Sequence, residues 1–168
     1  MMSDNRSTTR DTVMFSAPPA PGRPVVRIRA LGTPIAQGSK KAFVVGGRAR
    51  LVESAAGLPA WRSQVEYAAL NGLDAAGITG PLDGPLELTV EFRFRMPTSR
   101  RAALRRRGVA HRDRAPDLDK LQRAVYDALA NAGVLTNDSR IVCVVATKRE
   151  YVEGWVGADI TITELEDM

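Results

Sequence analysis

The segment at 86–95, LELTVEFRFR, alternates apolar and polar residues without a break. Leu86, Leu88, Val90, Phe92 and Phe94 take every second position, and polar side chains fill the positions between them. Because successive side chains of a strand point to opposite faces of a sheet, this pattern predicts a strand with one buried and one solvated face. Such a sheet needs a second layer to cover its buried face.

Two segments have the apolar spacing of helices that can form this second layer. The first begins at Leu58, has Pro59 in its first turn and is expected to end at Gly72. The second begins near Leu118 and is expected to end at Gly133. The apolar stripes are Leu58, Trp61, Val65, Ala68 and Ala69 in the first helix, and Leu118, Leu121, Val125, Ala128 and Leu129 in the second.

Further strands are expected on both sides of these helices. VVRIRALG at 25–32 alternates, RIVCVVATKREYV at 140–152 indicates a buried strand, and GADITITELE at 157–166 indicates a strand at a sheet edge. Gly46 and Gly47 lie between strand-like pieces and indicate a hairpin turn. The order of elements predicts an α+β fold, a mixed sheet with two main helices on one face.

The chain of 168 residues fits one globular domain at 24–168, behind a tail at 1–23 that we expect to be disordered. The tail has no apolar run of signal-peptide length, and no later window approaches a membrane span. The single cysteine, Cys143, favours a reducing compartment. We therefore expect a soluble, cytoplasmic protein that does not act at a membrane. A phosphate loop and a GxGxxG motif are both absent, so no small-molecule organic cofactor is expected.

Positive charge is concentrated between Arg93 and Arg114, where nine arginines stand with one acid, Asp113. The chain as a whole carries a formal net charge of +5, so the remainder is net negative. A segment of this density can neutralise several phosphates, and the guanidinium fork fits phosphate oxygens. The segment predicts nucleic-acid binding. The alternative is a solvated loop that aids solubility or binds any polyanion.

Three aspartates flank the second helix, Asp117 and Asp119 at its start and Asp138 in the turn after it. Each has an ordinary structural explanation, as an N-cap, as a charge near the helix N-terminus, or as a turn residue. Residues i and i+2 share a face only where the backbone is extended, and Pro116 places the first pair at a loop-to-helix junction. A hard divalent cation prefers oxygen ligands and would offset the repulsion between these acids and phosphates. The aspartates are therefore candidate metal ligands as well as candidate caps.

The stretch DLDKLQRAVYDALANAGVLTNDSRIV, followed by VVATKREYV, closely resembles the signature of the RusA-type Holliday junction resolvases, magnesium-dependent endonucleases common in bacteria and prophages. GTPIAQGSKKAF, PAWRSQV and LELTVEFRFRMP resemble the family's first loop, first helix and middle strand, so the likeness covers roughly residues 25–164. The combination of DxD, the helix and an aspartate 21 residues after the first is far more specific than any single motif. The resemblance implies the RusA-like two-layer fold and a homodimer.

By position, the resemblance implies that Asp117, Asp119 and Asp138 bind magnesium, for which manganese can substitute, and activate the water that attacks the phosphodiester. Arg123 stands where the best-known members have a catalytic lysine. Because arginine stays protonated, we expect Arg123 to stabilise charge on the phosphate rather than transfer protons. Asp127 is interpreted as its salt-bridge partner.

Basic residues around these acids complete the expected DNA-binding surface. Lys120 takes the place of the family's usual asparagine, and Lys148 matches a basic position in the family's strand, while His111 is interpreted as a loop residue. The residues expected to contact DNA are Lys40, Lys41, Arg100, Arg101, Arg105, Arg106, Arg107, Arg112, Arg114, Lys120 and Lys148.

We therefore expect a magnesium-dependent endodeoxyribonuclease that resolves four-way DNA junctions by paired hydrolysis in recombination and repair. Two alternatives remain at this point. One is a non-catalytic nucleic-acid-binding module whose aspartates are helix caps, and the other is a branched-DNA nuclease without junction selectivity. The sequence does not separate junction from flap preference, or a host gene from a prophage gene.

Overall fold

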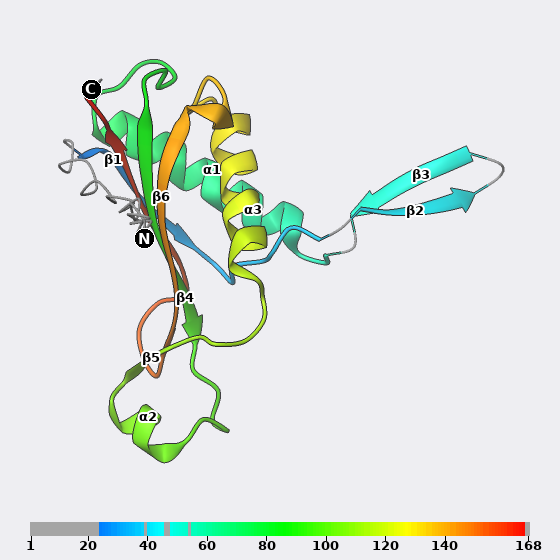
Figure 1. Ribbon diagram of the computed structural model, residues 1–168, viewed down its shortest axis with the longest axis vertical. Helices are drawn as coiled ribbons and strands as arrows, with labels where there is room; N and C mark the ends of the chain where they lie inside the picture. Colours follow the sequence, from blue (N-terminus) through cyan, green and yellow to red (C-terminus); the bar gives the residue numbers. More distant parts are fainter. Residues whose placement is uncertain (1–23, 39, 46–47, 54, 167–168) are drawn as a thin grey trace, which may run out of the picture.

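The computed structural model describes residues 24–38, 40–45, 48–53 and 55–166, so the expected tail at 1–23 lies outside the described residues. Its centre is a five-stranded sheet of order β1-β7-β4-β6-β5 (Figure 1). The strands are β1 (Pro24–Leu31), β4 (Leu86–Arg95), β5 (Val109–His111), β6 (Ile141–Tyr151) and β7 (Gly157–Glu164). β4 and β6 are parallel, and the other neighbouring pairs are antiparallel. The sheet is mixed, as the sequence predicted.

Two long helices, α1 (Leu58–Ala75) and α3 (Leu118–Asn131), cover one face of this sheet (Figure 1). The short elements are α2 (Ala102–Arg106) and the 3-10 turn η1 (Asp138–Arg140). β2 (Lys40–Val45) and β3 (Arg48–Glu53) form a separate antiparallel hairpin that extends away from the sheet (Figure 1). The expected turn residues of this hairpin, Gly46 and Gly47, lie outside the described residues. The predicted α+β class, with two main helices on one face, is confirmed.

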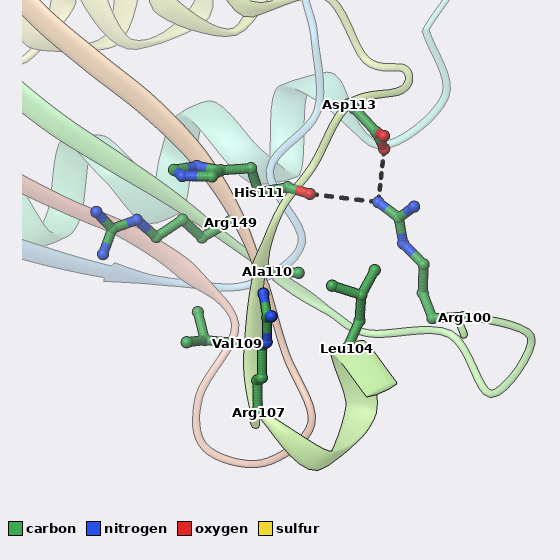
Figure 2. Close-up of a pocket in the computed structure, with 8 residues that line it drawn as sticks. All are labelled: Arg100, Leu104, Arg107, Val109, Ala110, His111, Asp113 and Arg149. Carbon is green, nitrogen blue, oxygen red and sulfur yellow. Dashed lines mark hydrogen bonds and ion pairs between the residues drawn. The ribbon is translucent and has the colours of Figure 1, made fainter. Parts of the chain in front are cut away.

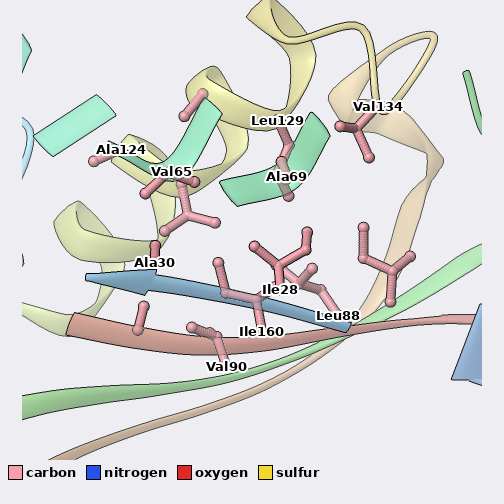
Figure 3. Packing of buried hydrophobic residues seen from close by; sticks show 14 of the residues in the cluster. Ile28, Ala30, Val65, Ala69, Leu88, Val90, Ala124, Leu129, Val134 and Ile160 are labelled. Carbon is pink, nitrogen blue, oxygen red and sulfur yellow. The ribbon is translucent and has the colours of Figure 1, made fainter. Parts of the chain in front are cut away.

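The alternation in β4 separates the two faces of the sheet as expected. All five of its apolar side chains are buried against the helices, and Thr89 and Arg95 on the opposite face are exposed. Figure 3 shows Leu88 and Val90 of β4 packed with Ile28 of β1 and Ile160 of β7 beneath the two helices. One continuous apolar core therefore fixes both helices on the sheet.

α1 continues past Gly72, which the sequence analysis expected to be its end. Gly72 is buried where α1 crosses β1, and a Cβ atom there would lie 2.9 Å from the backbone oxygen of Arg27 and 3.0 Å from Ile28. The glycine allows the helix to approach the strand closely and does not terminate it. α3, in contrast, ends as predicted, because Gly133 follows it with φ of 70°.

The positions of the last two strands are the reverse of those expected. β7 lies between β1 and β4 in the sheet, whereas β6 is bordered on one side only by the three-residue strand β5. Val142, Val144 and Val145 of β6 are accordingly 63%, 38% and 49% exposed. An apolar run does not distinguish a central strand from an edge strand, so the prediction of a buried strand was wrong for this part of β6. In the described part of the chain, no helix is both long and apolar enough to cross a membrane.

Candidate active site

Asp117 lies at the junction between a loop and α3, as its sequence position predicted. Its backbone is extended (φ −67°, ψ 139°), and its carbonyl accepts the first helical hydrogen bond, from the amide of Leu121 at 3.1 Å. Its carboxylate caps no helical amide and instead accepts from the Lys120 ammonium group at 2.8 Å. A hydrogen bond and an ion pair with Lys120, and the charge of Lys148, lower the pKa of Asp117 below its ordinary value. The carboxylate is thus ionised and faces solvent.

Asp119 lies in the first turn of α3 and is exposed. The pKa of Lys120 is raised mainly by Asp117, with a further contribution from Asp119, and is lowered by Arg123. These charges therefore lie in one neighbourhood at the start of α3. Among the described residues Arg123 makes no ion pair, and Asp127 instead binds Arg62 of α1 at 2.6 Å. The expected pairing of Asp127 with Arg123 was wrong, and Arg123 stays exposed beside Asp119.

Lys148 connects β6 to the loop before α3. Its ammonium group donates to the carbonyl oxygen of Pro116 at 2.7 Å and to that of Arg114 at 3.0 Å. These bonds fix the backbone immediately before Asp117. Lys148 thus points toward this region, as one interpretation of its sequence position predicted, and it holds the loop that presents the first aspartate.

Asp138 is exposed at the first position of η1, at the far end of α3 from Asp117. α3 has 14 residues, which corresponds to about 21 Å at 1.5 Å per residue. Figure 1 shows the turn between α3 and β6 at the upper end of this helix and the start of α3 at its lower end. Within the described part of the chain, no three histidine, cysteine or acidic side chains come together as a metal site. The structure brings Asp117 and Asp119 together and does not bring Asp138 to them.

The buried carboxylate of Glu150 binds three side chains of the arginine-rich segment. It is 0% exposed, and it accepts hydrogen bonds from Arg100 at 2.7 Å, Arg112 at 2.8 Å and Arg114 at 2.7 Å. Burial alone would raise the pKa of Glu150, but the hydrogen bonds from Arg100 and Arg114 outweigh it and keep that pKa below 4.5. One buried carboxylate therefore holds three guanidinium groups, which leaves an excess of positive charge beside the loop that carries Asp117.

The remaining basic residues differ in whether their side chains contact other parts of the protein or face solvent. Arg105 donates to the carbonyl of Pro97 at 3.0 Å, whereas Arg101, Arg106 and Arg107 are exposed at α2 and its flanks. Two arginines of β4 have structural contacts, since Arg93 stacks on Tyr151 and Arg95 donates to the carbonyl of Val152. Lys40 and Lys41 belong to β2, and their side chains lie outside the described part of the structure. The exposed arginines of α2 are the ones best placed to meet DNA.

A cavity of about 430 Å³ lies between α2, β5 and the end of β6 (Figure 2). Figure 2 shows Arg100 turned toward Asp113 and the His111 carbonyl, at 2.6 and 3.3 Å. The guanidinium groups of Arg107 and Arg149 and the side chain of His111 also line the cavity. Its charge suits an anion such as a phosphate. The interpretation of His111 as a loop residue was wrong, because His111 is the last residue of β5. A strand of three residues is too short to produce a periodic signal in the sequence.

A family model described as "Endodeoxyribonuclease RusA" matches residues 32–163, which include both long helices and the three aspartates. No curated protein matches the chain.

We predict that Glu150→Gln lowers the free energy of unfolding at neutral pH by about 3 to 5 kcal/mol, because the three arginines lose their buried counter-charge. The folded-state pKa of Glu150 lies below its ordinary value, so its contribution is present above pH 4.5 and is lost as the pH falls through the folded-state pKa. The difference from the parent protein should therefore shrink below pH 4.5. Urea unfolding at several pH values measures it.

Glu153→Gln removes an exposed acid nearby and serves as the control for this measurement. We expect it to change the free energy of unfolding by less than about 0.5 kcal/mol. If the difference between Glu150→Gln and the parent protein did not change with pH, the ionised carboxylate would not be what holds the arginines.

Proposed function

Because the chain belongs to the RusA family of Holliday junction endodeoxyribonucleases, we propose that it resolves four-way DNA junctions by magnesium-dependent, paired hydrolysis in recombination and repair. The observation that best supports this is the exposed, ionised Asp117 beside Asp119, at the edge of the arginine cluster on Glu150. Acids placed against DNA phosphates oppose binding unless a cation lies between them. The arrangement therefore favours a metal-assisted nuclease over a module that only binds DNA.

The donor set fits a hard cation in part. Asp117 and Asp119 offer carboxylate oxygens that no helix cap uses, and magnesium keeps several waters and takes few protein ligands. Asp138, the third expected ligand, lies too far away within one chain. A bound magnesium ion would lower the pKa of a coordinated water and offset charge on the phosphate. Manganese is the expected substitute.

The other residues of the proposed site supply positive charge near the phosphate or fix the position of Asp117. Arg123, exposed on the same helix, supplies a fixed positive charge for the attacked phosphate. Lys148 holds the Pro116 carbonyl and with it the backbone that leads into Asp117. Lys120 pairs with Asp117 at 2.8 Å, and a metal ion would compete with it for that carboxylate.

We propose a homodimer, since a four-way junction has two-fold symmetry and its resolution needs one nick on each of two strands. The protein would act in the cytoplasm of a bacterium, from a host or prophage gene. Labelled four-way, flap and linear DNA, incubated with and without magnesium, distinguish a resolvase from a nuclease without junction selectivity and from a binding module.

Asp119→Asn tests the catalytic assignment. We expect it to abolish junction cleavage and to leave junction binding unchanged or tighter, because one negative charge near the phosphates is removed. Gel-based cleavage and binding assays on the same labelled junction measure both effects. Asp74→Asn, at an exposed position on α1, is the control and should cleave at the parent rate. Full activity of Asp119→Asn would refute the assignment.

The exposed arginines of α2 can be tested by salt dependence. Replacing Arg106 and Arg107 with alanine should weaken junction binding and reduce the slope of log affinity against log salt by about 0.9 for each phosphate that the protein no longer neutralises. Arg27→Ala removes an exposed arginine from β1 and should leave the slope unchanged. An unchanged slope in the double variant would mean that these arginines face solvent in the complex.

Arg123 is tested with two substitutions. Arg123→Ala should lower the cleavage rate by roughly a hundredfold or more, as expected when one preorganised electrostatic interaction with the transition state is removed. Arg123→Lys should keep much of the activity, because lysine also supplies a cation. Single-turnover cleavage across a pH series measures both variants. Cleavage by Arg123→Ala near the parent rate would remove this residue from the catalytic set.

A further inference from the structure

The cavity between α2, β5 and the end of β6 has apolar as well as cationic walls (Figure 2). Leu104, Val109 and Ala110 supply aliphatic surface, and Arg107 and Arg149 supply guanidinium groups. Its volume of about 430 Å³ is within the range of about 300 to 1,000 Å³ that is usual for small-ligand sites. A phosphate alone would use only the cations, so the lining suits a ligand that has an apolar part as well.

The positive charge of this cavity is balanced only in part. Arg100 binds Asp113, the acid of the lining, at 2.6 Å. Arg149 lies 3.2 Å from Glu91, but the same carboxylate also binds a second arginine at 2.7 Å. Arg107 makes no ion pair with any residue that the structure describes. The cavity can therefore accept negative charge from a ligand.

The edge of β5 that faces away from β6 contributes backbone groups to the cavity. Residues of an antiparallel strand alternate between bonding to the partner strand and pointing their amide and carbonyl away from it. The Gly108 carbonyl and the Arg112 amide bond to β6 at 3.0 Å, and Ala110 pairs with β6 between them. The amides and carbonyls of Val109 and His111 therefore point away from β6, to the side where no other described strand lies.

These backbone groups can recognise a nucleobase. The His111 carbonyl accepts from Arg100 in the cavity at 3.3 Å, whereas the amide and the carbonyl of Val109 have no hydrogen-bond partner among the described residues. The Val109 backbone thus offers one donor and one acceptor side by side, which matches the hydrogen-bonding edge of a base. The His111 side chain lies on the same face as that of Arg149, its partner across β5 and β6, and its ring offers a surface on which a base can stack.

We propose that the cavity binds one unpaired nucleotide of branched DNA. The base lies against Leu104 and the Val109 backbone, and its phosphate is bound by Arg107 and Arg149. The inference rests on the branched-DNA substrate proposed above, and the site is separate from the aspartates. A nucleotide at a branch point is easier to move out of the stack than a paired nucleotide inside a duplex, because fewer stacking and pairing interactions are lost.

The position of the cavity favours a nucleotide within a DNA strand over a free nucleotide. Arg101 and Arg106 are exposed beside it on α2 and its flank, so further phosphates can bind there. Asp113 lines the cavity and precedes Asp117 by four residues, which separate their Cα atoms by at most about 14 Å. Because the phosphates of one strand follow each other at about 3.4 Å along the helix axis, this distance corresponds to about four nucleotides. A strand cut at Asp117 can thus also enter the cavity.

An abasic residue separates the contribution of the base from that of its phosphate. Two four-way junctions each carry one extra residue at the branch point, an unpaired deoxyadenosine in the first and an abasic residue in the second. The parent protein should bind the first junction at least about fivefold more tightly in gel shifts without magnesium, because the second lacks the stacking and hydrogen bonds of the base. Equal affinities would overturn the proposal.

Variants of the cavity assign this preference to the site. His111→Ala removes the ring, and Leu104→Ser removes aliphatic surface. Each variant should bind these two junctions with equal affinity and bind a fully paired junction as the parent does, which also shows that it is folded. Tyr67→Ala removes an aromatic ring on α1, where the residue is 68% exposed, and should keep the preference. A preference that survives in both cavity variants would mean that the base binds elsewhere, and would overturn the proposal.

A fluorescent base gives a readout on the parent protein alone. Aminopurine, an analogue of adenine, emits weakly when it is stacked between DNA bases and more strongly outside the stack. Placed at the unpaired position, it should emit more strongly once the parent protein binds, because the cavity removes it from its neighbouring bases. Unchanged emission with bound protein would overturn the site. Saturation of the protein by micromolar deoxyadenosine monophosphate in calorimetry would identify a free nucleotide as the ligand and overturn the assignment to DNA.

Cleavage of the same junctions distinguishes a failure of this site from a failure of the proposed function. A protein that shows the base preference but cuts no junction would refute the resolvase function and keep the nucleotide site. A protein that cuts junctions and shows no base preference would refute the nucleotide site alone.

Discussion

Four charged side chains meet near the end of β6, and only Glu150 among them is negative. Its buried carboxylate accepts from Arg100, Arg112 and Arg114, which come from three places along the arginine-rich segment. Without that carboxylate the guanidinium groups would repel one another and the segment would lose its anchor to the sheet. The chain from α2 to α3 passes over this point, so the position of Asp117 depends on it.

The same interaction explains why the number of arginines does not equal the number of DNA contacts. Arginines at Glu150 are held in place and neutralised in part, and Arg93 stacks between the Tyr151 and Trp155 rings at 3.7 and 4.5 Å. These guanidinium groups mainly make contacts that stabilise the fold. The exposed ones at α2 carry charge that no described acid offsets. Within one basic segment, some arginines are thus held by protein contacts and others face solvent. Only those that face solvent can exchange their counterions for phosphates.

Sequence patterns correctly predicted those features of the fold that depend on neighbouring residues along the chain. The alternation of β4 and the stripe of α3 depend on which side chains face the core, and both were predicted correctly from sequence. Strand order was not, because an apolar run such as that around Val144 looks alike in a central strand and in an edge strand. Gly72 was misinterpreted for a related reason: its role depends on β1, which lies far away in sequence. Asp127 likewise binds Arg62 on another helix rather than its neighbour along α3.

Spacing along the chain predicted the aspartates as a set, but it does not give their distance in space. The segment between Asp119 and Asp138 is mostly helix. Because a helix runs in one direction, the third carboxylate lies at the opposite end of α3 from the first two. The structure places positive charge, not the third acid, beside Asp117: Lys120 pairs with its carboxylate, and Lys148 holds the backbone immediately before it. Sequence spacing therefore identifies the acids that belong to one motif, whereas the folded chain decides which charges each of them meets.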